Sequence, residues 1–380
     1  MIDIAVVGYG FRGKVLSNLM LKMNKNVKIS AIVDNRIEEI KNELGESSGH
    51  IDFYDTVDEL LDHETPDGII ISTRCSSHAQ IAIKVLEKRI PFILEKPVST
   101  NLKDLMALKS AYERSGTEVA VPFSLRLNTL GQAAKEIAES GILGTIEHVQ
   151  AINNVSYGSV YFQHWYRDDE ETGGLFLQKA THDFDMIQYI LKLRPIWISA
   201  VKSKQIFKGD KPAGLTCAAC EEQDTCPESA ILHREKGEPV HGEMCCFAVD
   251  TGNEDSGSAI IQYESGMHAS YSQNFFARNK AATRMFRFLG YKGTMEFDYY
   301  TNRIHVNMHH TTRSEIYDIP FGDDTHGGGD IVVCQSLLDT ITKGFPSQTP
   351  FEEAMQSALL CLKAKESAET RTFQEIKWSE

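Results

Sequence analysis

The feature that most constrains this chain is an apolar run followed at once by three spaced glycines. Residues 2–7 are almost continuously apolar, which is typical of a strand buried on both faces of a parallel sheet. Gly8, Gly10 and Gly13 then complete the pattern G-x-G-x-x-G. In this pattern the first glycine allows a tight turn, the second lets a pyrophosphate approach the backbone, and the third lets helix and strand pack closely. A helix over residues 12–23 would then point its N-terminus at the phosphates.

The residues after this helix strengthen the prediction of a Rossmann-type domain. A second apolar run, residues 27–33, ends at Asp34, about twenty residues beyond the last glycine, where a carboxylate accepts the ribose 2′-OH. Asp34 favours NAD, whereas Arg36, two residues later, is suited to the 2′-phosphate of NADP. We therefore predict an NAD(P) cofactor, with NAD favoured over NADP.

Length and charge narrow the class of protein. With 380 residues the chain exceeds the usual size of a single core and suggests two domains. Its formal net charge of −14 argues against a nucleic-acid partner. The sequence has no apolar run of about eighteen residues and no signal-peptide pattern, so we expect a cytoplasmic protein without a membrane partner.

The pattern of elements predicts an α/β fold with two domains. Residues 1–122 read as an N-terminal Rossmann domain with a doubly wound parallel sheet. Residues 123–380 read as a substrate-binding α+β domain with a large, mainly antiparallel sheet and a cysteine-containing insertion at about residues 203–245. One face of such a sheet can carry substrate and the other a subunit contact, so we expect a homodimer or tetramer.

Two loops follow buried strands of the first domain. Ser72, Thr73 and His78 come after one strand, and Glu95-Lys96-Pro97 after the next. Carboxyl ends of parallel strands are where open α/β sheets bind ligands. Desolvation there would lower the pKa of Lys96 toward that of a general base. The alternative is a surface lysine paired with its neighbour Glu95.

These motifs resemble the Gfo/Idh/MocA family, the glucose–fructose oxidoreductase and inositol dehydrogenase group, and the resemblance extends over the whole chain. It implies that Lys96 contacts the substrate and the nicotinamide ribose, and that the last helix packs back on the first domain. It also places His78 beside the cofactor, the alternative being a histidine that only packs at a helix start. The residues expected to bind the cofactor are Gly8, Tyr9, Gly10, Phe11, Arg12, Gly13, Asp34, Arg36, Ser72, Thr73, His78, Glu95 and Lys96.

The family resemblance also points to a proton-handling group in the second domain. Family members carry Asp-x-x-x-His on a helix after a glycine pair, and His182 matches that histidine, while Gln178 replaces the aspartate. Lys179 lies one turn before His182, so a single helix would place the three side chains on one face. We interpret Lys179 as a replacement of the catalytic role, the alternative being a lysine whose ammonium reaches solvent. The expected catalytic residues are Lys96, Lys179 and His182.

Further residues are expected to bind substrate by resemblance. Arg126 lies in a segment similar to the family's Asn-x-Arg crossover, but Ser124 replaces the asparagine, so Arg126 either orients substrate or ties the domains together. His326 lies in a motif similar to H-x-G-x-D. The expected substrate-binding residues are Arg126, His164, Trp165, Lys179, His182, Asp183 and His326.

The cysteine-containing insertion departs from the common family pattern. Cys217, Cys220 and Cys226 are followed by the pair Cys245 and Cys246. A C-x-x-C pair with further cysteines suits a structural zinc ion, although the spacing matches no standard pair of knuckles. Reduced thiols or a labile disulfide are the alternatives to a zinc site. We expect no catalytic role for these cysteines.

Three functions fit the sequence. The first is an NAD(P)-dependent oxidoreductase that moves a hydride to or from a secondary alcohol of a small-molecule sugar, cyclitol or derivative. The second is an NAD-dependent glycosidase that acts by transient oxidation and elimination, for which the altered Gln178 and Lys179 leave room. The third is a non-catalytic NAD(P) or sugar sensor, which the presence of Lys96 and His182 disfavours.

Overall fold

The computed structural model describes residues 1–320 and 325–378, the side chains of residues 325 and 326 excepted. The expected substrate residue His326 therefore lies outside the described side chains. The chain divides into two compact units, one of residues 1–129 and 322–359 and the other of residues 130–321 and 360–380. No helix in the described residues is both long and apolar enough to cross a membrane.

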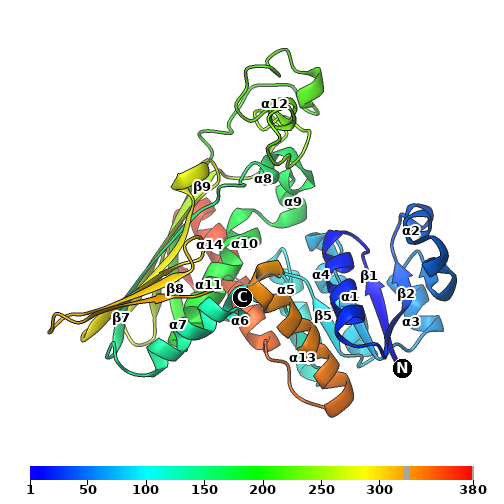
Figure 1. Cartoon of the computed structure of the whole chain (residues 1–380), viewed down its shortest axis with the longest axis horizontal. Coiled ribbons are helices and arrows are strands. Elements are labelled where there is room, and N and C mark those ends of the chain that lie inside the picture. Colours follow the sequence, from blue (N-terminus) through cyan, green and yellow to red (C-terminus); the bar gives the residue numbers. More distant parts are fainter. Residues whose placement is uncertain (321–324, 379–380) are drawn as a thin grey trace. The chain divides into compact units, whose positions relative to one another are not determined.

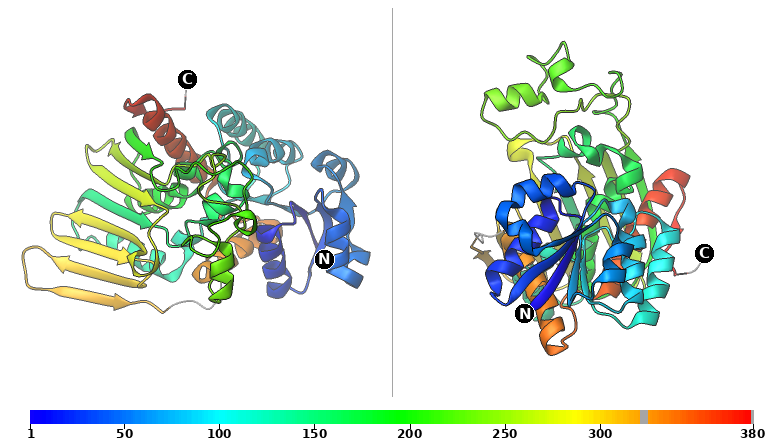
Figure 2. Two further views of the ribbon diagram at one scale, coloured as in Figure 1. Left: turned by 90° about the horizontal axis from the view of Figure 1, so that it is seen from above. Right: turned by 90° about the vertical axis from the view of Figure 1, so that its right-hand side faces the viewer.

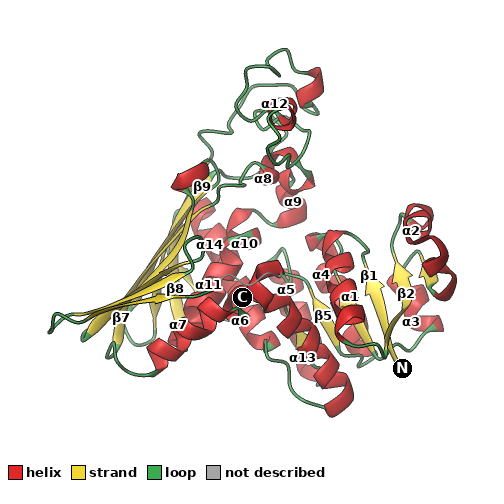
Figure 3. Ribbon diagram, viewed as in Figure 1, coloured by secondary structure: helices red, strands yellow, loops and turns green. Residues whose placement is uncertain are grey.

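Unit 1 is built on a six-stranded parallel sheet, which confirms the predicted Rossmann fold (Figures 1 and 3). The central strands are buried on both faces, as their unbroken apolar sequences predict. The strands lie side by side in the order β3 (Asp52–Tyr54), β2 (Val27–Val33), β1 (Ile2–Val7), β4 (Gly68–Ile71), β5 (Phe92–Leu94) and β6 (Val119–Ala120).

Local signals in the sequence set the helices of unit 1. Thr56 and Glu59 form a capping box at the start of α3 (Val57–His63), as expected from the cap residue Thr56. Gly116 ends α5 (Leu102–Ser115) in the left-handed conformation. The other α-helices described wholly within this unit are α1 (Phe11–Met23), α2 (Ile37–Leu44), α4 (His78–Glu87), α6 (Ser124–Leu127) and α13 (Gly329–Lys343), and α14 (Phe351–Thr370) begins in it.

Helix α13 lies far along the chain yet completes the core of unit 1. Its Val333, Cys334, Leu337 and Leu338 are buried with side chains of β1 and α1. A boundary after residue 122 would leave α13 outside this core. The apolar stripe of α13 has its partner in the first sheet, and this packing explains why residues 322–359 belong to unit 1.

Unit 2 is built on a nine-stranded sheet, which confirms the predicted large and mainly antiparallel sheet (Figure 3). Only β7 and β10 pair in parallel. The order is β14 (Ser314–Asp318), β13 (Arg303–Met308), β12 (Gly293–Asp298), β11 (Thr283–Gly290), β7 (Ile146–Asn154), β10 (His268–Asn274), β9 (Ser256–Tyr263), β8 (Pro195–Ser203) and β15 (Gln374–Glu375).

The two faces of this sheet differ. Along β9 burial alternates strictly, with Ala259 and Ile261 buried and Ile260 between them exposed. Helix α11 (Ala180–Leu191) lies along one face of the sheet (Figures 1 and 2). Between β8 and β9 the chain leaves the sheet for residues 204–255, which are mostly loop and contain the short helix α12 (Ala230–Glu235) (Figure 3).

The expected single helix carrying Gln178, Lys179 and His182 is two helices. Helix α10 (Leu175–Gln178) ends at Gln178, and Lys179, with a φ of −114° and a ψ of −49°, separates it from α11. The prediction of a single helix through these residues was therefore wrong. A break of one residue leaves the spacing of apolar residues almost unchanged, so periodicity does not reveal it.

Candidate functional site

The glycine loop of unit 1 has two crowded positions and one open position. Gly8 has a φ of +88°, and a Cβ there would lie 2.8 Å from the Ser72 and Thr73 backbone. A Cβ on Gly13 would lie 2.3 Å from the carbonyl oxygen of Gly8. Gly10 has no atom within 4 Å of the corresponding point. The first and third glycines thus serve close packing, while the second borders open space.

The first turn of α1 is suited to an anion. Its N-cap is Gly10, which has no side chain to accept the first amides, and the turn contains no acidic residue. The exposed amides and the helix dipole both favour negative charge at this end. Together with the open space at Gly10, these features fit the pyrophosphate of a dinucleotide.

Asp34 lies directly beyond the end of β2, as the fingerprint predicts. Its carboxylate accepts hydrogen bonds from the Tyr9 amide at 2.8 Å and from the guanidinium of Arg36 at 3.0 and 3.1 Å. Partial burial acts to raise the pKa of Asp34, but the hydrogen bonds from Arg36 and Tyr9 outweigh it and lower the pKa. Asp34 is therefore held ionised, with Arg36 beside it.

Arg12 is tied to protein carboxylates. Its Nε donates to Glu95 at 2.7 Å, and its two terminal nitrogens form a bidentate pair with Asp330 at 2.9 and 3.0 Å. The hydroxyl of Ser124 also donates to Asp330 at 2.7 Å. Arg12 thus joins the glycine loop to the Glu95-Lys96-Pro97 segment and to the start of α13, and Ser124 joins the same network.

His78 is buried between the two loops that follow β4 and β5. Nδ1 lies 2.8 Å from the Pro97 carbonyl oxygen and Nε2 lies 3.2 Å from that of Thr73. Burial lowers the pKa of His78 and favours the neutral ring. Its position therefore links the loop after β4 to the loop that carries the half-buried Lys96.

Arg126 is 1% exposed and forms an ion pair with Glu353 on α14 (Phe351–Thr370). Its guanidinium carbon also lies 5.7 Å from the centroid of the Phe123 ring. These contacts are all within unit 1. In unit 2, His164 is exposed, and Trp165 stacks on Tyr166 with ring centroids 3.9 Å apart.

Lys179 is the most unusual side chain of unit 2. It is buried, donates a hydrogen bond to the Tyr157 hydroxyl, and places Nζ 4.7 Å from the centroid of the Tyr157 ring. Burial, with a further contribution from the positive charge of Arg284, lowers the pKa of Lys179 to about 7, while Asp183 opposes the change. Lys179 can therefore take up or release a proton near neutral pH.

Asp183, in the first turn of α11, is fully buried and surrounded by donors. It accepts hydrogen bonds at 2.7 Å from Asn153, Tyr271 and Arg284. A buried carboxylate with three donors, one of them a guanidinium, is well compensated. Asp185 is also buried, whereas His182, directly before Asp183, is partly exposed.

The partners of Asp183 come from one row across the sheet. Arg284 on β11 pairs in register with Asn153 on β7, and Asn153 pairs with Gln273 on β10. Tyr271, two residues before Gln273, points to the same buried face. Polar residues thus replace apolar ones at matching inward positions of three neighbouring strands.

Sequence reasoning missed Tyr157, Asn153, Tyr271 and Arg284. A signal was present for Arg284 and Asn153, because each occupies an inward position of a strand whose other inward positions are apolar. A charged residue at such a position predicts a buried partner of opposite charge. Tyr157 lies in a loop after β7 and has no comparable signal.

Comparison with known proteins gives the family. Residues 2–123 match the model described as the oxidoreductase family with NAD-binding Rossmann fold, and residues 132–296 match the Gfo/Idh/MocA C-terminal domain. The chain belongs to the Gfo/Idh/MocA oxidoreductase family. This confirms the expected family and its NAD-binding fold.

Individual relatives of this Gfo/Idh/MocA protein are distant. The putative oxidoreductase YteT of Bacillus subtilis is 26% identical over 251 residues, 59% of this chain and 58% of that protein. Myo-inositol 2-dehydrogenase of Thermotoga maritima is 26% identical over 191 residues, 50% of this chain and 54% of that protein. The matches thus span little more than half of these relatives.

A structural likeness covers the whole chain. Levoglucosan dehydrogenase, solved in complex with NADH and L-sorbose, superimposes with a TM-score of 0.79 and covers 100% of this chain and 99% of that chain. At 19% sequence identity this likeness shows that the two proteins share a fold.

Proposed function

We propose that this protein is an NAD(P)-dependent oxidoreductase that moves a hydride between the nicotinamide and a secondary alcohol of a sugar, cyclitol or derivative. The observation that carries the proposal is the buried Lys179, whose pKa of about 7 equips it to exchange a proton with an alcohol. The oxidation of an alcohol releases a hydride and a proton, and the protein must provide for both.

The residues of unit 1 fit the dinucleotide. The first turn of α1 and the open space at Gly10 would hold the pyrophosphate, and Asp34 would accept from a ribose hydroxyl. When bound, the nicotinamide supplies hydride transfer. Since Arg36 already pairs with Asp34, the carboxylate would repel a 2′-phosphate while Arg36 is engaged, which supports NAD over NADP.

Lys179 in its neutral form would accept the proton of the substrate hydroxyl during oxidation. Its environment favours the neutral form because the side chain is buried and the positive charge of Arg284 acts on it. Tyr157 would orient the amine through the hydrogen bond between them. His182, partly exposed in the first turn of α11, and Lys96 of unit 1 would bind the substrate hydroxyls and assist the transfer.

Asp183 acts as a positioning residue in this proposal. Its carboxylate already accepts from three protein donors and is fully buried, so it would fix Arg284 instead of contacting substrate. Arg284 in turn contributes to the lowered pKa of Lys179. Arg12 and His78 would have a comparable role in unit 1, because they contact Glu95 and Pro97, the chain neighbours of Lys96.

The experiment is incubation of the full chain with NAD or NADP and a panel of sugars and cyclitols that includes myo-inositol and levoglucosan. Accumulation of reduced dinucleotide supports the proposal. Release of free sugar from glycosides without net reduction would replace it by the glycosidase function, and saturable binding without turnover would replace it by a sensor.

A variant test accompanies this assay. Lys96→Ala should abolish turnover while dinucleotide affinity falls only modestly, since Lys96 is expected to act on the substrate hydroxyl and to contact one ribose. Lys109→Ala, at a surface pair on α5, is the matched control and should leave turnover unchanged. Unchanged turnover in Lys96→Ala would remove that residue from the mechanism.

A further inference from the structure

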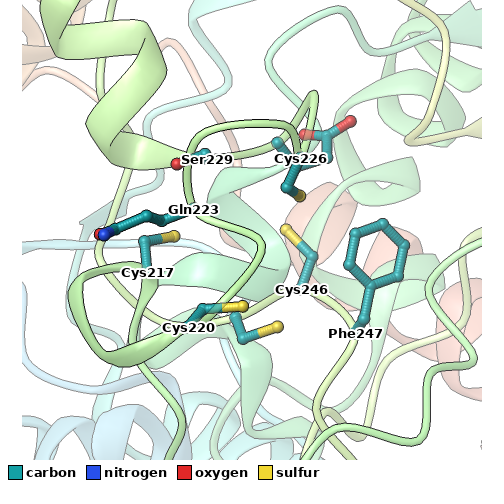
Figure 4. Close-up of a pocket in the computed structure, with 9 residues that line it drawn as sticks. Cys217, Cys220, Gln223, Cys226, Ser229, Cys246 and Phe247 are labelled. Carbon is teal, nitrogen blue, oxygen red and sulfur yellow. The ribbon is translucent and has the colours of Figure 1, made fainter.

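The cysteines of the insertion gather around one cavity in unit 2. Cys217, Cys220, Cys226, Cys245 and Cys246 all line a small cavity of about 20 Å³. The sulfur atoms of the labelled cysteines point toward its centre (Figure 4). Residues distant in the sequence thus bring their thiols to one place, in a segment where the proposed reaction has no role.

The size of the cavity limits what it can contain. A cavity needs roughly 10–15 Å³ to hold a single water molecule. The observed volume therefore suits one atom-sized occupant and is too small for a multi-atom iron–sulfur cluster. Four thiolates in a tetrahedral set select zinc or such a cluster, and a cavity of this size favours the single zinc ion.

Backbone amides are directed at three of these sulfur atoms. The Ala230 amide donates to Cys217 Sγ at 3.4 Å, and the amides of Glu228 and Phe247 donate to Cys226 and Cys245. Amide donors of this kind stabilise the charged thiolate form that binds a metal ion.

Cys246 differs from the other four cysteines. It belongs to an apolar cluster that includes Phe162, Phe207 and Phe275 and is 2% exposed. Its packing therefore accounts for its burial without a ligand. Cys217 and Cys220 form the C-x-x-C pair, which leaves Cys226 and Cys245 to complete a set of four.

We propose that Cys217, Cys220, Cys226 and Cys245 bind one Zn²⁺ ion that stabilises the insertion between β8 and β9. Among the described residues no group of three possible ligands already stands at metal-binding geometry. Binding therefore requires the sulfur atoms to move closer to one another and the thiols to release their protons. The ion would cross-link residues 204–255, whose loops otherwise have few regular elements to fix them.

The test is metal analysis of the full-length protein purified under reducing conditions, after growth with added zinc. We expect about one zinc ion per chain. Cys220→Ser and Cys226→Ser should each lose most of the zinc, whereas the matched control Cys246→Ser should retain it. Since a ligand variant can fail to fold, wild-type protein is also stripped with a chelator and reloaded with Co²⁺, which gives the visible bands of a tetrahedral thiolate site.

Several results would overturn the proposal. These are wild-type protein without bound zinc or Co²⁺ bands, a disulfide between any two of the four cysteines in protein purified without reductant, or iron with the absorbance of a cluster. Loss of zinc in Cys246→Ser but not in Cys226→Ser would also overturn the assignment. Metal content is independent of turnover, so this test and that of the proposed function fail separately.

Discussion

The ammonium of Lys179 donates to the Tyr157 hydroxyl and lies over the Tyr157 ring, with Nζ 4.7 Å from the ring centroid. Both residues belong to unit 2, one in the loop after β7 and the other between α10 and α11. The contact holds a buried amine in one orientation. It is also the contact on which the proposed proton transfer depends most directly.

The rate of alcohol oxidation should follow the titration of Lys179. Because the neutral amine accepts the proton, kcat/KM for oxidation should rise with pH through about 7 and level off above it, and the reverse reaction should fall over the same range. Lys179→Arg keeps a charge that does not titrate and should lose about 10²–10⁴ in rate. Steady-state kinetics from pH 5.5 to 9 provide the measurement.

A matched control for Lys179→Arg is Lys204→Arg. Lys204 is another lysine of unit 2 whose pKa is lowered by burial, and it donates to the Thr251 carbonyl in the insertion. This variant should keep the wild-type pH profile. A wild-type rate in Lys179→Arg would contradict the proton-transfer role.

Lys179 should also make stability depend on pH. Its pKa in the folded protein, about 7, lies below its ordinary value of 10.5, so the unfolded chain binds more protons between these values. Stability therefore rises with pH in this window, by up to ~1.4 kcal/mol per pH unit. Lys179→Met lacks this dependence. Its stability advantage over wild type should be largest at pH 7 and below and should shrink toward pH 10, as measured by urea unfolding.

Asp34 and Arg36 should together set the choice of dinucleotide. Asp34→Ala removes the carboxylate and frees Arg36 for a 2′-phosphate, so the NAD/NADP ratio of kcat/KM should fall by roughly 10–100-fold, the value of a charged hydrogen bond. The double variant with Arg36→Ala should lose any gain with NADP. An unchanged ratio in Asp34→Ala would show that the ribose is recognised elsewhere.

Arg284 should be essential to the stability of unit 2. Arg284→Ala leaves the buried Asp183 without its guanidinium and should cost about 3–5 kcal/mol in the free energy of unfolding. Arg287→Ala on the same strand breaks a pair with Glu296 that is partly exposed and should cost about 1 kcal/mol or less. Denaturant titration of both variants measures the free energy of unfolding that each face of β11 contributes. Equal losses in the two variants would contradict the stabilising role of the Arg284–Asp183 pair.

The sequence predicted the local features of unit 1 well because they have short-range causes. The glycine spacing, the apolar strands, the acid at the end of β2 and the cap at Thr56 each depend on a few neighbouring residues. The break at Lys179 was missed because it leaves the periodicity intact. The Arg12 network was also missed, since Glu95 and Asp330 are brought to it by the fold from far along the chain.

In unit 2, too, features with local causes were predicted, and those that depend on residues distant in the sequence were missed. Lys179 and His182 were predicted as site residues from their own segment, whereas the surroundings that lower the pKa of Lys179 involve Arg284, which is distant in sequence. The placement of Arg284 depends on sheet register, which no local pattern fixes. For Arg126 the sequence left two roles open, which were orienting the substrate and tying the domains together. The structure shows its ion pair with Glu353, and both residues lie in unit 1.

The chain path through the two units has a practical consequence for experiments. Unit 1 takes α13 from the C-terminal part of the sequence, and α14 begins in unit 1 and ends in unit 2. Expressing residues 1–129 alone would leave the apolar surface of β1 and α1 uncovered and prone to aggregation. Neither unit corresponds to a contiguous gene fragment, so dissection of this protein requires point substitutions or circular permutation instead of truncation.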